Sequence, residues 1–154
     1  RDILKQLHLP EATTIYDGGV DRPNLELKTI EVYGMAQKIQ AFVALHHQNR
    51  SIDGVGAQVV YFSLISTLEE FSRELTRLNI SHYVYHGQLW DKDRKRSQEQ
   101  FLNDPKGVML ATPAFGLGIN KPDIRMVVHG EIPGSVEAYY QEVGRAGRDG
   151  LPAF

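Results

Sequence analysis

Short apolar runs alternate with longer amphipathic stretches along most of this chain, and this alternation narrows the folds open to it. Runs typical of buried strands lie at residues 57–62, 81–85, 108–111 and 124–129. Apolar residues at helical spacing predict helices at residues 34–48, after residue 66, at residues 90–103 and at residues 135–146. Strands that alternate with helices predict βαβ units, so we expect an α/β fold with a mainly parallel sheet.

Three local patterns add detail. Residues 25–32 alternate in part and predict one more strand. Thr67 and Glu70 have the spacing of a capping box, so we expect Ser66 or Thr67 to cap the helix that follows residues 57–62. Residues 1–9 predict a short helix that ends before Pro10 and leads into a turn-rich connector.

Composition excludes several classes of protein. A chain of 154 residues suits one domain with a hydrophobic core. No apolar run approaches the length of a membrane span, and the first residues do not form a signal peptide. The chain has no cysteine, which excludes disulfides, cysteine zinc sites and cysteine nucleophiles and fits an intracellular protein.

The net charge of -2 excludes a wholly basic nucleic-acid binder but not a local basic strip. One dense basic cluster is present, at Lys92, Arg94, Lys95 and Arg96. Because Asp91 and Asp93 are interleaved with it, the cluster on its own favours a solvated helix face.

Four polar or small residues follow directly on the predicted strands. They are Ser63, His86, Thr112 and Gly130. In open α/β sheets, ligands bind outside the carboxyl ends of the strands, so we expect these residues to lie along one functional edge.

The segment QEVGRAGRDG, residues 141–150, is hard to explain by packing alone. Arg145 and Arg148 are three apart and would share one face of a helix, while Gly144 and Gly147 each cost a helix interior about 1 kcal/mol. One interpretation is that the arginines face an anion and the glycines admit a close neighbour. The alternative is that Arg145 pairs with Glu142, Arg148 pairs with Asp149 or another carboxylate, and the glycines end a helix.

The chain lacks the motifs of a self-sufficient nucleotide enzyme. It contains no Gly-Lys dipeptide, so it has no phosphate loop, and no strand ends in an acidic pair for magnesium. Gly116 and Gly118 do not continue into a dinucleotide fingerprint, and no nucleophile motif or metal-ligand spacing is present. Anion-facing groups without a phosphate cradle suggest half of a site, completed by a partner.

These motifs resemble those of the second RecA-like domain of RecQ-family DNA helicases. The segment ATPAFGLGINKPDIRMVVH resembles helicase motif V, and YYQEVGRAGRDG resembles motif VI. YHGQLWDKDRKRSQEQF and DRPNL also resemble RecQ segments, so the match covers nearly all of residues 21–150. The resemblance implies a RecA-like three-layer sandwich at residues 23–154, preceded by a connector at residues 1–22 from a first motor domain.

The resemblance also implies an ATP-dependent DNA helicase of which this domain is one half. ATP and Mg²⁺ would be held mainly by the first RecA-like domain, so the chain alone is expected to be monomeric and inactive. Its partners would be that domain and DNA, at a single strand or a duplex junction, in the nucleoid or the nucleus.

Site residues follow by matching positions. Arg148, and with it Arg145, would face the γ-phosphate as arginine fingers. Gln141, Gly118, Asn120 and Asp123 would serve the ATP side, Lys121 with Asp123 keeping the motif V loop in shape. Thr112, Pro113, Ser63, His86 and Gly87 would contact DNA.

The sequence departs from the family most clearly after the first buried strand. Leu64 and Ile65 stand where the family has Ser-Arg, which removes one basic phosphate contact. Gly87 and Gln88 replace the common Ala-Gly. A second hypothesis therefore stays open: a non-catalytic α/β module that binds nucleic acid or a partner through the same edge.

Overall fold

The computed structural model describes residues 22–51, 56–116 and 119–154. The elements along the chain are α2 (Gly34–Ser51), β1 (Ala57–Tyr61), α3 (Ile65–Arg77), β2 (Tyr83–Tyr85), α4 (Asp91–Asn103), β3 (Val108–Ala111), β4 (Ile124–His129) and α5 (Val136–Val143). The helix expected at residues 1–9, nearly all of the connector expected at residues 1–22 and the candidate Gly118 lie outside the described residues.

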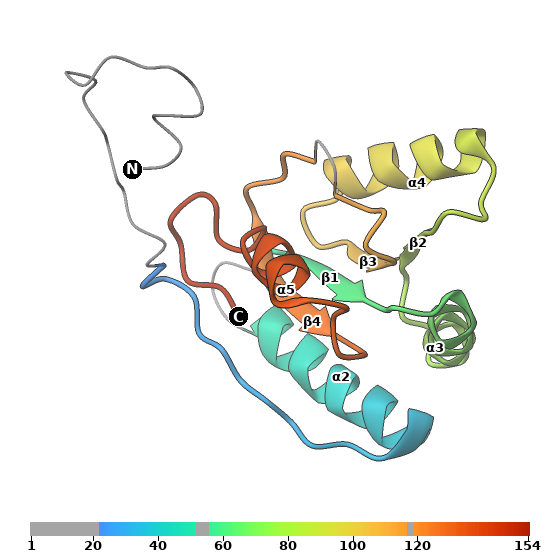
Figure 1. Ribbon diagram of the computed structural model, residues 1–154, viewed down its shortest axis with the longest axis horizontal. Coiled ribbons are helices and arrows are strands. Elements are labelled where there is room, and N and C mark those ends of the chain that lie inside the picture. Colours follow the sequence, from blue (N-terminus) through green and yellow to red (C-terminus); the bar gives the residue numbers. More distant parts are fainter. Residues whose placement is uncertain (1–21, 52–55, 117–118) are drawn as a thin grey trace.

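The four strands form one parallel sheet in the order β2-β3-β1-β4. Every residue of β1 and β3 is buried, as expected for inner strands covered on both faces. Figure 1 shows α2 and α3 on one side of the sheet and α4 and α5 on the other. The predicted α/β class and the three-layer RecA-like arrangement are confirmed.

Alternate residues of the strands build two cores. Val59 and Tyr61 of β1 point to the face where Phe101 of α4 and Phe115 pack. Val60 points to the opposite face, among Phe42 of α2 and the α3 residues Leu68, Phe71 and Leu75. The period of two along β1 therefore holds the helices on opposite faces.

The strand predicted at residues 25–32 is wrong. Only Leu25 makes a bridge, to Ala153, and Leu27 and Ile30 are largely exposed. The physical reason is that the outer edge of β4 is already taken: the Val127 amide donates to the Phe154 carbonyl at 2.8 Å, and the Phe154 amide donates to the Arg125 carbonyl at 2.9 Å. Partial alternation without a free edge does not make a strand.

The predicted capping box is also wrong. α3 begins at Ile65 after Leu64, and no side chain of its own first turn caps it. Instead, the Glu131 carboxylate accepts hydrogen bonds from the amides of Ser63 at 2.8 Å and Leu64 at 3.0 Å. A residue from beyond β4 thus supplies the negative group that the start of a helix attracts.

The last helix is shorter than the predicted 135–146. Ser135 caps α5 by accepting from the Ala138 amide at 3.1 Å, and the helix ends at the cap residue Gly144. Arg145 and Arg148 therefore follow the helix in turns, and the expectation that they share one face of a helix is wrong. For Gly144, the alternative that a glycine ends the helix is the correct one.

Candidate functional site

The carboxyl ends of the four strands meet at one edge of the sheet, as expected. Tyr61 is in register with Ala111 and His129, and Ala111 with Tyr85. After β1 the chain turns to α3 on one face. After β3 it turns to the other face, where Phe115 packs. Such a switch point is where open α/β sheets hold their ligands.

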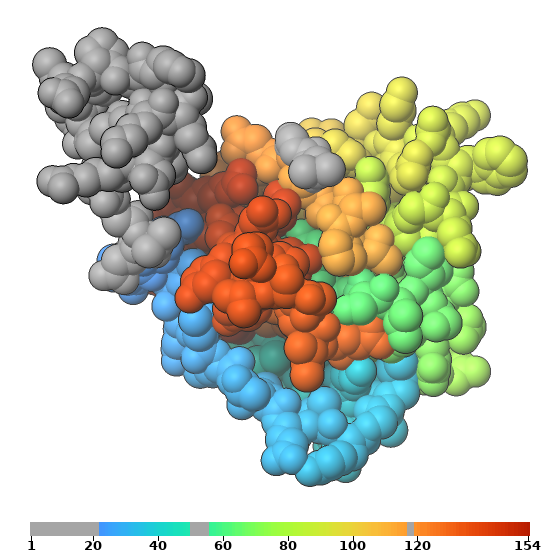
Figure 2. Space-filling model, viewed as in Figure 1, coloured from blue at the N-terminus to red at the C-terminus, as the bar shows by residue number. Residues whose placement is uncertain are grey.

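The residues proposed for nucleic acid divide by exposure along this edge. Pro113, Gly87 and Ser63 are exposed, whereas Thr112 and His86 are buried. In Figure 2 the segments that follow β1 (green), β2 (yellow-green) and β3 (light orange) lie side by side on one face. The three exposed positions are the ones able to touch a ligand directly.

The buried pair plays a different part. The Thr112 amide donates to the Tyr85 carbonyl at 3.1 Å and thereby extends the β2–β3 pairing. His86 Nε2 lies 4.0 Å from the Glu69 carboxylate, and within the described residues His86 Nδ1 has no hydrogen-bond partner. Exposed Ser63 already uses its hydroxyl as a donor, to the Ile132 carbonyl at 3.2 Å.

Two loops carry the remaining candidates, apart from Gln141 on α5, and are bonded to each other. We call residues 112–123 the β3–β4 loop and residues 144–150 the arginine loop. Arg145 Nη1 donates to the Gly116 carbonyl at 2.5 Å, and Arg148 Nη1 donates to the Ile119 carbonyl at 3.2 Å. Both arginines thus reach across to the same loop, and no carboxylate pairs with either among the described residues.

Gly116 is the position that allows this approach. Its φ is +126°, which L side chains rarely adopt, and a Cβ there would lie inside the guanidinium group of Arg145. The close neighbour that this glycine admits is therefore an arginine of the same chain.

The two arginines differ in exposure. Arg148 is exposed, and its Nε makes one further bond, to the Gly144 carbonyl at 3.4 Å. Arg145 is half-buried, and in the described part of the chain its Nε has no acceptor. Burial raises the pKa of the neighbouring Tyr61 hydroxyl to about 12, although the positive charge of Arg145 acts in the opposite direction.

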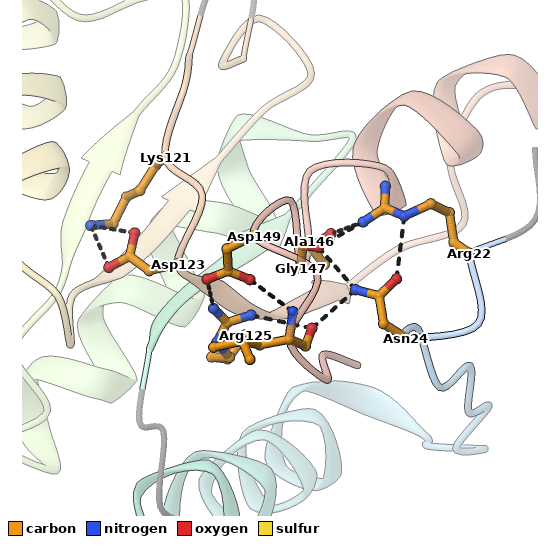
Figure 3. Close-up of polar contacts among 9 residues, drawn as sticks. Arg22, Asn24, Lys121, Asp123, Arg125, Ala146, Gly147 and Asp149 are labelled. Carbon is orange, nitrogen blue, oxygen red and sulfur yellow. Dashed lines mark hydrogen bonds and ion pairs between the residues drawn. The ribbon is translucent and has the colours of Figure 1, made fainter. Parts of the chain in front are cut away.

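The start of the domain braces the arginine loop (Figure 3). Arg22 Nη2 donates to the carbonyls of Ala146 at 2.8 Å and Gly147 at 2.9 Å. Asn24 Nδ2 donates to the same Gly147 carbonyl at 2.9 Å and to that of Leu151 at 3.0 Å. Four bonds from two side chains therefore fix the backbone on which Arg148 stands.

One ion pair holds the end of the arginine loop. Arg125, which is buried, pairs with Asp149 at the end of the arginine loop. Burial acts to raise the pKa of Asp149, but hydrogen bonds from Arg125 and from the Leu151 amide outweigh it and hold that pKa below its usual value.

Lys121 fastens the β3–β4 loop to α4. Its buried Nζ lies 3.2 Å from the Asp123 carboxylate, donates to the Leu102 carbonyl at 3.2 Å and sits over the Phe101 ring. We expected Lys121 and Asp123 to hold the motif V loop in shape, and these contacts suit that role. The Asp123 carboxylate is thereby paired with Lys121. Asn120 and Gln141 are exposed.

The alternative pairing of Arg145 with Glu142 does not occur. Glu142 is buried and pairs with His129 at 2.8 Å, and the His129 ring stacks on Tyr61. Likewise Asp149 pairs with Arg125 and not with Arg148.

Sequence reasoning missed two contributors. Glu131 carried a signal, because a carboxylate directly after a strand lies at the functional edge, yet its partners from β1 are about 70 residues away in sequence. Arg22 lies in the segment DRPNL, and nothing in the sequence shows that it reaches the arginine loop.

Within residues 22–51, 56–116 and 119–154, no three histidine or acidic side chains gather as a metal site. No helix in these ranges is long and apolar enough to cross a membrane.

The parallel sheet in the order β2-β3-β1-β4, with helices on both faces, defines a RecA-like α/β domain, and the comparisons agree. The family described as "Helicase conserved C-terminal domain" matches residues 37–150. The chain belongs to this family.

Among curated relatives, the chain is 42% identical over 150 residues to the ATP-dependent DNA helicase RecQ of Bacillus subtilis, which covers 97% of the chain and 24% of that protein. It is 38% identical to the bifunctional 3'-5' exonuclease/ATP-dependent helicase WRN of Mus musculus, covering 97% of the chain and 11% of that protein. The chain spans about a quarter, or less, of the length of these relatives. The resemblance to the RecQ-family C-terminal domain is confirmed.

Solved structures agree on the fold. Dbp5 of S. cerevisiae bound to RNA and ADP BeF3 superposes with a TM-score of 0.68 at 20% identity, over 99% of this chain and 41% of that one. Domain 2 of the DEAD-box helicase Mss116p bound to an RNA duplex gives 0.65 at 17% identity, over 75% of this chain and 46% of that one.

Proposed function

We propose that this chain is the second motor domain of an ATP-dependent DNA helicase, in which Arg148 acts as an arginine finger on ATP bound by a first RecA-like domain. The observation that carries the proposal is the exposed Arg148 on a loop braced by Arg22, Asn24 and the Arg125–Asp149 pair. The names of its relatives support the ATP and DNA assignments.

Phosphoryl transfer explains why an arginine is needed. Negative charge builds on the γ-phosphoryl oxygens and the bridging oxygen in the transition state, and a planar, permanently charged fork stabilises it. Arg148 fits that anion because it is exposed, whereas Arg145 is half-buried and its Nε, which has no acceptor within the described residues, is shielded from solvent. Mg²⁺ and the phosphate loop would belong to the first domain, and Gln141 and Asn120 would face the nucleotide from this one.

DNA would lie along the strand ends beside this site. Exposed Pro113, Gly87 and Ser63 would touch its backbone, while buried Thr112 and His86 would set the edge in place. The bond from Arg145 to Gly116 joins the ATP side to the DNA side, so movement of one loop moves the other. This contact is our candidate for the coupling of hydrolysis to unwinding.

One observation favours the second candidate, a binding module without turnover. Both arginines donate to carbonyls of their own chain, so they also have a purely structural use. The two candidates differ in what the loss of Arg148 removes.

The test is single-turnover ATP hydrolysis by the full-length parent with Arg148→Ala, with and without single-stranded DNA. We expect a loss of about 10³-fold, or about 4 kcal/mol of transition-state stabilisation, with DNA affinity nearly intact. Arg148→Lys should rescue poorly because lysine lacks the bidentate fork. Arg77→Ala, an exposed arginine at the far end of α3, serves as the control. Near-normal turnover with lost DNA affinity would favour the binding module.

A further inference from the structure

Trp90 is the only tryptophan of the chain, and it is 82% exposed. Tryptophan is highly buried on average, so a ring this open to water is unusual. Its backbone is nevertheless fixed, since the amides of Asp93 and Arg94 donate to its carbonyl at 2.9 and 3.0 Å as α4 begins. The side chain is presented from a rigid support.

The position of Trp90 continues the functional edge. β2 ends at Tyr85, and a turn closed by the Leu89 amide on the His86 carbonyl at 3.2 Å leads directly to Trp90. β2 is the outer strand beside β3, so the segment after β2 lies at the end of the functional edge. Trp90 is in this segment, three residues after Gly87. Figure 1 shows α3 and α4 both beginning on the side where the strands end.

The charges beside Trp90 suit a polyanion. In the first turns of α4, Asp91 pairs with Arg94, and Asp93 lies 3.6 Å from Arg96. Lys92 and Lys95 are exposed and have no ion pair among the described residues. Their spacing of three places them as neighbours on the helix, which leaves two positive charges without an ion pair on the first turns of α4.

We propose that Trp90 is a stacking contact for a base of single-stranded nucleic acid, with Lys92 and Lys95 contacting the adjacent phosphates. Single-strand binders combine basic grooves with aromatic faces, and stacking tolerates any sequence because every base has a flat face. The proposal rests on the proposed function only in using the same edge for nucleic acid. It assigns a binding role to this chain's own Trp90 and not to the arginine loop.

The protein carries its own reporter. Titration with a short oligothymidylate at low salt should quench the tryptophan fluorescence, and all of that signal comes from Trp90. Added salt should reverse the quenching, because phosphate contacts release counterions. Unchanged fluorescence while a labelled oligonucleotide binds would overturn the proposal, and so would the absence of binding at low salt.

Variants separate stacking from charge. By anisotropy of the labelled oligonucleotide, Trp90→Ala should lower affinity by about 5-fold to 100-fold, and Trp90→Phe should lose less. Lys92→Gln and Lys95→Gln should each reduce the salt slope by roughly 0.7. Leu78→Ala removes a half-exposed apolar side chain at the other end of α3 and should change nothing.

Two further outcomes bear on the proposal. Equal affinity of Trp90→Ala and the unchanged protein would overturn it, and so would quenching that grows with protein concentration without DNA, since that marks an interface between copies. Arg148→Ala should leave the quenching intact. Quenching is measured on the 154-residue chain, and arginine-finger activity is measured on the full-length parent. Normal quenching with lost arginine-finger activity, or the reverse, therefore distinguishes failure of one proposal from failure of the other.

Discussion

Gly116 shows how one residue fixes the relation between the two loops. We expect Gly116→Ala to destabilise the domain by about 2 kcal/mol or more, because its positive φ strains any Cβ and the Arg145 guanidinium occupies the space. Urea unfolding of the 154-residue chain measures this. Gly134→Ala is the matched control, since nothing lies within 4 Å of its Cβ position. Equal effects of the two substitutions would contradict the packing of Arg145 on Gly116.

Asp149 makes stability depend on pH. Its pKa is lower in the folded protein than in the unfolded chain, so its stabilisation is present above about pH 4 and is lost as the pH falls through the folded pKa. Asp149→Asn should cost about 1–2 kcal/mol at neutral pH, since it leaves the buried Arg125 without its partner, and should flatten the acid limb of Tm against pH. Asp91→Asn, in an exposed pair, should change Tm little.

At the scale of elements, the segment at the start of the domain acts on the loop at its end. We expect Arg22→Ala with Asn24→Ala to speed hydrogen exchange at the Gly147 amide, which donates to the Ile124 carbonyl at 2.9 Å. Exchange in α4 should be unaffected. Arg22→Lys should restore part of the protection. Unchanged exchange at Gly147 would mean that the loop holds its shape without the brace.

The sequence predicted well those elements whose run of apolar residues coincides with the residues that are buried in the fold. β3 and β4 have the predicted bounds because their apolar runs lie between two packed faces. The strand expected at residues 25–32 failed because Phe154 holds the edge it needed, and α5 ended early because of Gly144. Both failures depended on contacts or turns that periodicity does not report.

The candidate site was predictable in outline for the same reason. Strand ends predicted Ser63, His86, Thr112 and Gly130 at one edge without any motif. The glycine–arginine pattern of residues 141–150, together with the family resemblance, singled out Arg145 and Arg148. What the sequence could not give is the partner of each arginine, because the carbonyls of Gly116 and Ile119 lie 29 residues away along the chain. Every residue has a main-chain carbonyl, so the residue type does not reveal which carbonyl accepts a hydrogen bond.

For the molecule as a whole, we expect the 154-residue chain to fold as a monomer and to hydrolyse no ATP. The reason is that its sequence contains no phosphate loop and its described residues gather no metal-binding cluster. Phosphate release with excess ATP and single-stranded DNA is the measurement, and the full-length parent is the positive control. DNA-stimulated turnover by the pure chain would refute the division of labour between two domains.

The strand order also governs how the chain reaches its fold. β1 pairs with β3 and β4, which begin 51 and 67 residues after β1 begins, so none of its ladder bonds forms locally. During synthesis at about 5–20 residues per second, this buried strand waits several seconds for its neighbours. Such non-local parallel pairing slows folding and leaves an open edge exposed to aggregation. The central strand that unites the two cores is thus exposed to aggregation until both of its neighbours have been synthesised.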